Sequence, residues 1–149
     1  MRFLPTAVVI STLSLTCVYA PASRLDDSPT ALAALQVKAD QAHPRDRCFL
    51  YAELVSQTTD LAGQQFNSGD SKQASETLKL VQRYAEKIRM GVADDSKKLR
   101  DAELLMRRTS FRLKGILNGA SYEDRPALEV TLKQLNQVQE QLMMQVFKK

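Results

Sequence analysis

The chain has 149 residues, a formal net charge of +4, two cysteines, one histidine and no tryptophan. It contains neither the Glu-x-x-His pairs of di-iron helical bundles nor the Cys-x-x-Cys-His motif that attaches c-type haem. Glycine is scarce, whereas leucine, alanine, glutamine and lysine are common, as is typical of helical proteins.

The first 22 residues have the pattern of a secretory signal peptide. Arg2 supplies a positive start, an apolar stretch covers residues 7–18, and Ala20-Pro21-Ala22 offers small residues for a signal peptidase. We expect cleavage after Ala22. The apolar stretch is shorter than the ~20 residues of a spanning helix, so the sequence predicts an exported chain, periplasmic or secreted, without a transmembrane helix after cleavage.

Removal of residues 1–22 leaves 127 of the 149 residues, enough for one domain with a hydrophobic core. We expect a lead-in and short helix over 23–43 and a helical bundle domain over 44–149. Cys48 is then the single remaining cysteine, so an intramolecular disulfide is excluded and burial must stabilise the fold.

The short helix is predicted to begin at Ser28-Pro29, with Ser28 as the cap and Pro29 at the first helical position. Its apolar stripe is narrow and ends at His43-Pro44. Two placements stay open for it, one packed across the bundle and one as a free arm. The stripe consists of Leu32, Leu35, Ala39 and Ala42.

The next helix is predicted to begin at Pro44 and to run to the turn residues Asn67-Ser68-Gly69. Asp70, with Gln73 three residues later, has the pattern of a capping box and starts another helix, so these two helices form an antiparallel hairpin. The apolar face of the first of them consists of Cys48, Tyr51, Val55, Thr58, Ala62 and Phe66, widened by Leu54 and Leu61.

A longer apolar seam runs through residues 70–119 in steps of three and four, which is typical of helices packed side by side. Lys87, Arg89 and Gly91 favour a helix end, and Asp94 and Asp95 favour a new start, which predicts a turn near 91–94. The alternative is one continuous helix over 70–118 and a total of three long helices. The seam consists of Ala74, Leu78, Val81, Ala85, Ile88, Val92, Asp95, Leu99, Ala102, Met106, Thr109, Leu113 and Ile116.

Asn118-Gly119 ends this segment, and Ser121 or Asp124 caps a last helix. Short loops make consecutive helices antiparallel. The sequence therefore predicts an all-α fold, an up-down-up-down four-helix bundle with a short N-terminal helical arm. The face of the last helix consists of Leu128, Leu132, Leu135, Val138, Leu142 and Val146, with Met143 and Phe147 beside it.

Leu61-Ala62, Gly69-Asp70, Ala74 and Leu78 are similar to part of a tetratricopeptide helix pair. The spacing from Phe66 to Gly69 is one residue short of the pattern of that family, and no second copy follows at a period of 34 residues. We therefore expect a helical hairpin here, and we transfer no function from that family.

Catalytic chemistry has little support in the sequence. His43 and Cys48 are the one histidine and the one mature cysteine, but they lie on opposite sides of a helix start, so we expect no enzyme and no cofactor or metal site. Two hypotheses stay open for Cys48. It is either a small buried residue of the core, or an intermolecular disulfide or reactive thiol beside Arg45 and Arg47.

Positive charge is concentrated in residues 70–114, which suggests a surface for an anionic ligand such as a lipid head group, nucleic acid or an acidic protein. Many of these charges have acidic neighbours at helical spacing, as in Asp94–Lys98, Lys97–Asp101 and Glu103–Arg107, so an ordinary solvated face is the competing interpretation. The candidate surface consists of Arg83, Lys87, Arg107, Arg108 and Arg112.

We therefore expect a non-catalytic scaffold or protein-interaction module that binds a protein partner or self-associates. Leu32 and Leu35 of the arm, and Leu142, Val146 and Phe147 of the last helix, are the expected contact surfaces. The alternative is a binder of an anionic ligand in the cell envelope. Aromatic residues that could stack on bases are few, Tyr84 and Phe111 among them, so we do not expect nucleic acid, and nothing specifically indicates a membrane surface.

Overall fold

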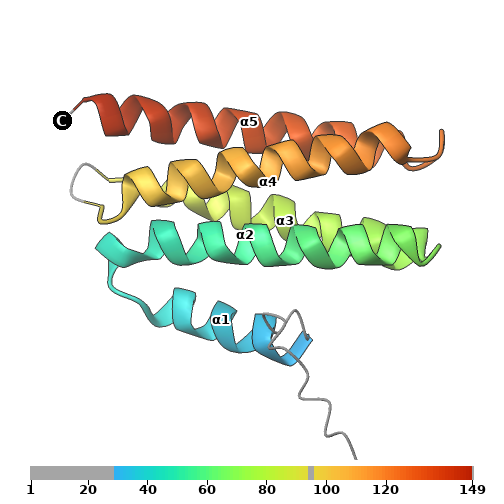
Figure 1. The fold of residues 1–149 in the computed structure, drawn as a ribbon. Coiled ribbons are helices and arrows are strands. Elements are labelled where there is room, and N and C mark those ends of the chain that lie inside the picture. The colour runs from blue at the N-terminus through green and yellow to red at the C-terminus, as the bar shows by residue number, and fades with distance from the viewer. Residues whose placement is uncertain (1–28, 94–95, 149) are drawn as a thin grey trace, which may run out of the picture.

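Five α-helices make up the computed structural model, which describes residues 29–93 and 96–148, and no strand occurs in these two ranges. The all-α helical bundle predicted from the sequence is therefore confirmed. The helices lie roughly alongside one another (Figure 1). They are α1 (Pro29–Gln41), α2 (Pro44–Asn67), α3 (Ser71–Gly91), α4 (Leu99–Gly119) and α5 (Arg125–Phe147).

Several sequence predictions lie outside the described residues. These are the signal peptide over 1–22, the lead-in that follows it, the cap at Ser28, the seam position Asp95 and the pair Asp94–Lys98. Within the described part, none of the helices has the length and apolar character that a membrane span requires.

Cap and turn residues determine where the predicted helices begin and end. Pro44 is the first residue of α2, and the Nδ1 atom of His43 accepts a hydrogen bond from the Arg45 N–H at 3.3 Å. Gly69 has a φ of +83°, which suits glycine at a tight turn. Asp70 caps α3 because its carboxylate accepts from the Gln73 N–H at 3.3 Å.

The joint between α3 and α4 is a real interruption of the helix. α3 ends at Gly91, Val92 is extended, and α4 begins at Leu99 after Lys98 in the left-handed region at φ 54°. The predicted alternative of one continuous helix over 70–118 is therefore wrong. The Lys97 N–H donates to the Arg45 carbonyl at 2.8 Å, which fixes the start of α4 beside the start of α2.

The predicted seam supplies much of the core. Its positions on α3 and α4 from Ala74 to Leu113 are buried, apart from the half-buried Val92 in the joint and Asp95, which is outside the described residues. The predicted faces of α2 and α5 join the same core through Leu54, Val55, Leu135 and Val138.

The helices are arranged as two hairpins packed side by side. α2 and α3 form one hairpin, α4 and α5 form the other, and consecutive helices run in opposite directions (Figure 1). α2 lies beside α4 and α3 beside α5, whereas no Cα atoms of α3 and α4 come within 8 Å of each other. α3 and α4 therefore occupy diagonal corners, although they follow each other in the chain.

The short helix α1 is docked and is not a free arm. It packs against α2 and contributes Leu32 and Ala39 to the core. Gln36 accepts a hydrogen bond from the Tyr84 hydroxyl at 2.8 Å, which links α1 to α3 as well. α1 therefore lies against the outer side of the α2–α3 hairpin.

The close approach of α2 and α4 at Gly63 gives a test of this packing. A Cβ at Gly63 would lie 2.9 Å from Cδ1 of Ile116, so the Ile116 side chain must move, and we expect the larger side chain of Gly63→Leu to overpack the contact between the two helices. Overpacking of this kind costs about 1–3 kcal/mol of the free energy of unfolding. Urea unfolding followed by circular dichroism measures the change.

The matched control is Gly115→Leu, because Gly115 is on the same helix pair and has open space around its Cβ position. This substitution should leave stability unchanged or raise it by up to about 1 kcal/mol, because leucine favours a helix over glycine. Equal losses for the two variants would contradict the close packing at Gly63.

Candidate protein-interaction groove

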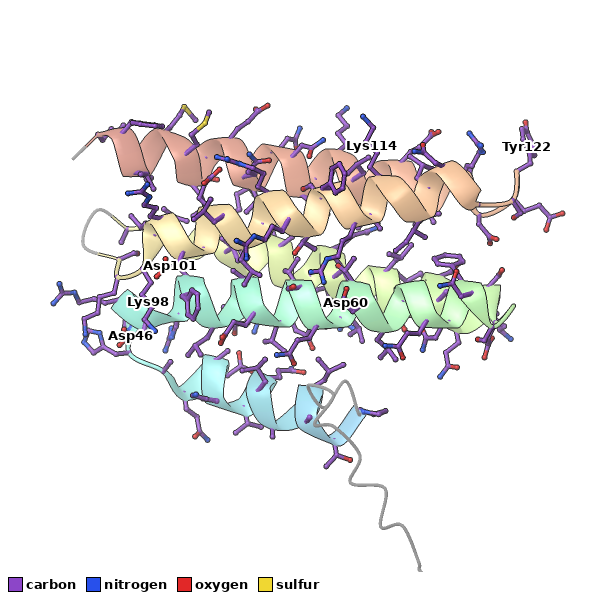
Figure 2. The ribbon with its side chains drawn as sticks, viewed as in Figure 1. Asp46, Asp60, Lys98, Asp101, Lys114 and Tyr122 are labelled. Atoms are coloured by element: carbon purple, nitrogen blue, oxygen red, sulfur yellow. The ribbon has the colours of Figure 1, made fainter. Side chains whose placement is uncertain are left out.

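An open groove runs between α2 and α4, the two parallel helices at the front of Figure 1. Its central part is a hollow of about 780 Å³. Asp60 lies between the two ribbons, as Figure 2 shows. The hollow is lined by Glu53, Ser56, Gln57 and Asp60 of α2 and by Leu105, Arg107, Arg108, Phe111 and Arg112 of α4.

The apolar part of this hollow comes from α4. Leu105 is half-buried and packs against the core, whereas the Phe111 side chain is 79% exposed. Phe111 is exposed because it lies on the outer side of α4, away from the core positions Met106, Thr109 and Leu113.

The charged side chains of the hollow differ in sign between its two walls. Acidic Glu53 and Asp60 are on α2, and the three arginines are on α4. Arg112 donates to the Asp60 carboxylate at 2.6 Å and to the Ser56 hydroxyl at 2.5 Å. In contrast, the side chains of Glu53 and Arg108 make no hydrogen bond or ion pair in the part of the chain that the structure describes.

Two further hollows adjoin the central one along α2. One, of about 570 Å³, shares Glu53 and lies mainly between the end of α1 and the first turns of α2, with Lys97 and Lys98 at its edge. Asp46 and Lys98 mark this end in Figure 2, and the Lys98 ammonium lies 4.6 Å from the Phe49 ring centroid. The other, of about 580 Å³, shares Asp60 and Arg112 with the central hollow. The groove between α2 and α4 therefore continues from the central hollow toward the C-terminal ends of the two helices, and its other end opens beside α1.

The predicted basic surface is divided by the fold. Arg107, Arg108 and Arg112 come together on α4, but Arg83 and Lys87 are on α3, at the diagonal corner. The single surface expected from the run of positive charge is therefore not formed.

Most of these basic side chains have carboxylate partners. Arg107 pairs with Glu103 at 2.6 Å, as predicted from helical spacing, and Arg112 pairs with Asp60 of another helix. Lys97 pairs with Asp46 at 3.7 Å, where the sequence suggested Asp101. The prediction for Lys97 was wrong because a neighbouring helix offered a partner that local spacing does not reveal.

Cys48 lies in the core with 1% of its surface exposed. Burial raises the pKa of its thiol to about 12, so the thiolate that reacts or forms a mixed disulfide is disfavoured at neutral pH. This placement agrees with the hypothesis of a small buried residue. The intermolecular disulfide or reactive thiol stays a prediction, and it would require the core to open first.

His43 is occupied as a cap of α2. Among the described residues, no group of three or more His, Cys, Asp or Glu side chains is placed to hold a metal ion. The hydroxyls of Thr58 and Ser110 are buried without a hydrogen-bond partner, but they lie on different helices and converge on no pocket.

The contact surfaces expected from the sequence are only partly exposed. Leu32 and Leu142 are buried within the chain, whereas Phe147 is 81% exposed. The groove between α2 and α4 was missed, since the sequence does not say which helices are neighbours. The available signal was Phe111, an aromatic residue out of phase with the apolar seam of its own helix.

The outer side of the α2–α3 hairpin already carries a helix, because α1 packs against α2 and bonds to α3 through side chains. Asp40 of α1 accepts hydrogen bonds from the Lys87 ammonium at 2.8 Å and from the Tyr51 hydroxyl. The hydrogen bond from Lys87, followed by that from Tyr51, lowers the pKa of the Asp40 carboxyl below its ordinary value of 3.8. The bundle thus shows, within its own chain, how its outer surface holds a short helix by apolar packing and charged contacts.

We expect Asp40→Asn to loosen α1, because the neutral amide loses the charge that Lys87 and Tyr51 bind. A carboxylate with a lowered pKa stabilises the folded chain above its ordinary pKa, and this contribution is lost as pH falls through the lowered value. Backbone hydrogen exchange of α1 should therefore accelerate by up to about fivefold at neutral pH.

The wild-type chain should show the same loss only in acid, below the ordinary carboxyl range. Asp46→Asn is the matched control, since Asp46 pairs with Lys97 and not with α1, and exchange in α1 should not change. An unchanged exchange rate in Asp40→Asn would show that apolar packing alone holds α1.

The whole chain was also compared with known proteins. No family model, no curated protein and no solved structure matches it. The function proposed below therefore rests on the contacts, charges and exposed side chains of this chain alone.

Proposed function

We propose that this protein is an exported, non-catalytic interaction module whose binding site is the groove between α2 and α4. The ligand of this groove is an amphipathic helix of a protein partner. Helices bind to grooves of this kind by placing apolar side chains, spaced three or four residues apart, on the floor of the groove.

The exposed Phe111 is the observation that carries this proposal. A single exposed apolar residue is common on protein surfaces, so exposure alone has little meaning. Phe111, however, lines a hollow of about 780 Å³ that also contains the half-buried Leu105 and has charged side chains on both walls. An apolar centre with a polar rim is the usual arrangement of a protein-interaction site.

The docking of α1 supports the same proposal. α1 buries Leu32 and Ala39 against the core and pairs Asp40 with Lys87 of α3. A partner helix on the α2–α4 groove would combine apolar and charged contacts in the same way.

The anionic-ligand alternative has less support. Arg107 and Arg112 already have carboxylate partners, and Glu53 and Asp60 line the same hollow. An anion approaching Arg108 would meet these carboxylates, whose repulsion offsets the attraction of the arginines. Binding to anionic vesicles at low salt that disappears at high salt would favour this alternative.

Display of a helical peptide library on phage tests the proposal without a known partner. We expect selection on the protein to yield amphipathic helices whose affinity falls at least about tenfold with Phe111→Asp, because a carboxylate would replace a central apolar contact. Fluorescence anisotropy of the selected peptides measures this ratio.

Tyr122→Asp is the matched control, because Tyr122 is also an exposed aromatic residue, 91% exposed, but lies outside the groove. The selected peptides should bind this variant as they bind the wild type. Selection of no helical peptide, or of peptides that bind the Phe111→Asp variant equally well, would refute the groove as the binding site.

Export is the second part of the proposal and has its own test. On expression of the full chain in a bacterium, we expect the protein outside the cytoplasm with Ser23 as its first residue, as intact mass and N-terminal sequencing would show. A chain that begins at Ser23 should stay inside the cell. Recovery of the full-length chain uncleaved in the cytoplasm would contradict this part.

A further inference from the structure

We infer that the groove between α2 and α4 binds a second copy of this chain. The two copies form a symmetric dimer, and its two-fold rotation axis runs along the groove, parallel to α2 and α4. This inference rests on the proposed function and names the partner helices as α2 and α4 of the other copy. In a face-to-face pair with this axis, α4 of each copy lies over α2 of the other, and the two grooves close on each other.

Charge complementarity supports this axis. The wall formed by α2 carries Glu53 and Asp60, and the wall formed by α4 carries three arginines. An axis along the groove places the basic wall of one copy on the acidic wall of the other. An axis across the groove would instead place α4 on α4 and bring arginines together, which like-charge repulsion disfavours.

The two side chains without partners lie at the same level of the groove. Arg112 bonds both Ser56 and Asp60, so it lies between these residues along α2. Arg108 lies one helical turn before Arg112 and is therefore level with the turn of α2 that includes Glu53. Because the axis runs along the groove, each copy then presents Glu53 to Arg108 of the other, which gives two identical ion pairs.

The apolar residues and the area of the face fit the same arrangement. Phe111 of each copy would lie on α2 of the other copy and leave solvent, whereas it is now 79% exposed. α2 has 24 residues and α4 has 21, so at 1.5 Å per residue and a helix diameter of ~10 Å the face measures roughly 600–700 Å² per copy. A total of roughly 1,200–1,400 Å² lies within the range of specific interfaces.

α1 borders only one end of this face, where Lys38 and Gln41, together with the following Ala42, line the hollow beside Glu53. No residue of α1 lines the central hollow. In Figure 1, α2 and α4 lie side by side and no other described helix crosses them. A second copy can therefore approach without displacing any described part of the chain.

Charge reversal at Glu53 and Arg108 tests the dimer in the full chain as the cell produces it, by sedimentation equilibrium in reductant. We expect the wild type to dimerise, and we expect Glu53→Arg and Arg108→Glu each to weaken the dimer at least about tenfold, because each variant places like charges opposite each other at both pairs. Lys133→Glu on α5, an equal change of charge outside the groove, should have no effect.

An equimolar mixture of the two single variants gives the decisive result. In the Glu53→Arg chain both positions are positive, and in the Arg108→Glu chain both are negative. Opposite charges therefore face each other at both pairs in the mixed dimer, but in neither homodimer. Native mass spectrometry separates the mixed dimer from the two homodimers by mass. We expect the mixed dimer to recover the wild-type affinity to within about twofold, which lies within the usual error of additivity.

Three results would overturn the inference: a monomeric wild type, single variants that dimerise as well as the wild type, or a mixture that stays monomeric. A dimer that forms only without reductant would also overturn it and would indicate a disulfide through Cys48. If the chain is monomeric but selected peptides still depend on Phe111, this inference fails and the proposed function stands. If both tests fail, the proposed function fails as well.

Discussion

The diagonal placement of α3 and α4 is the constraint on which the rest of the structure depends. α4 begins at the corner of the bundle diagonal to α3, and the bond between the Lys97 N–H and the Arg45 carbonyl fixes this start beside the start of α2. α2 and α4 must then run in the same direction. The two halves of the apolar seam face the same core from opposite corners, and the outer sides of two parallel helices form the groove.

The ends and apolar faces of the helices could be predicted because they depend on nearby residues. Pro44, Gly69 and Asp70 each act on their own turn, and the burial of the seam follows its spacing. The order in which helices contact one another is a property of the whole bundle. A joint predicted near 91–94 was located correctly in the chain, but nothing in its residues indicates that it leads to the diagonal corner.

The difference between local contacts and contacts between distant helices also explains which charged pairs of the candidate site could be predicted. The pair Glu103–Arg107 follows from helical spacing, so the sequence alone could suggest it. The pairs Asp60–Arg112, Asp40–Lys87 and Asp46–Lys97 join helices far apart in the chain. Pairs of this kind neutralise much of what looked like a continuous basic surface, and they could not be predicted before the neighbours of each helix were known.

The charged side chains without partners, Glu53 and Arg108, indicate what the groove binds better than its total charge does. Arg108 is exposed and the half-buried Glu53 lines open hollows, so both charges stay solvated and their lack of partners costs the monomer little. A groove with one acidic wall and one basic wall offers little net attraction to a ligand of uniform charge. It is instead complementary to a surface with the same division of charge, and α2 with α4 is such a surface. The exposed Phe111 on this face supplies the apolar contact that ion pairs on a surface do not provide by themselves.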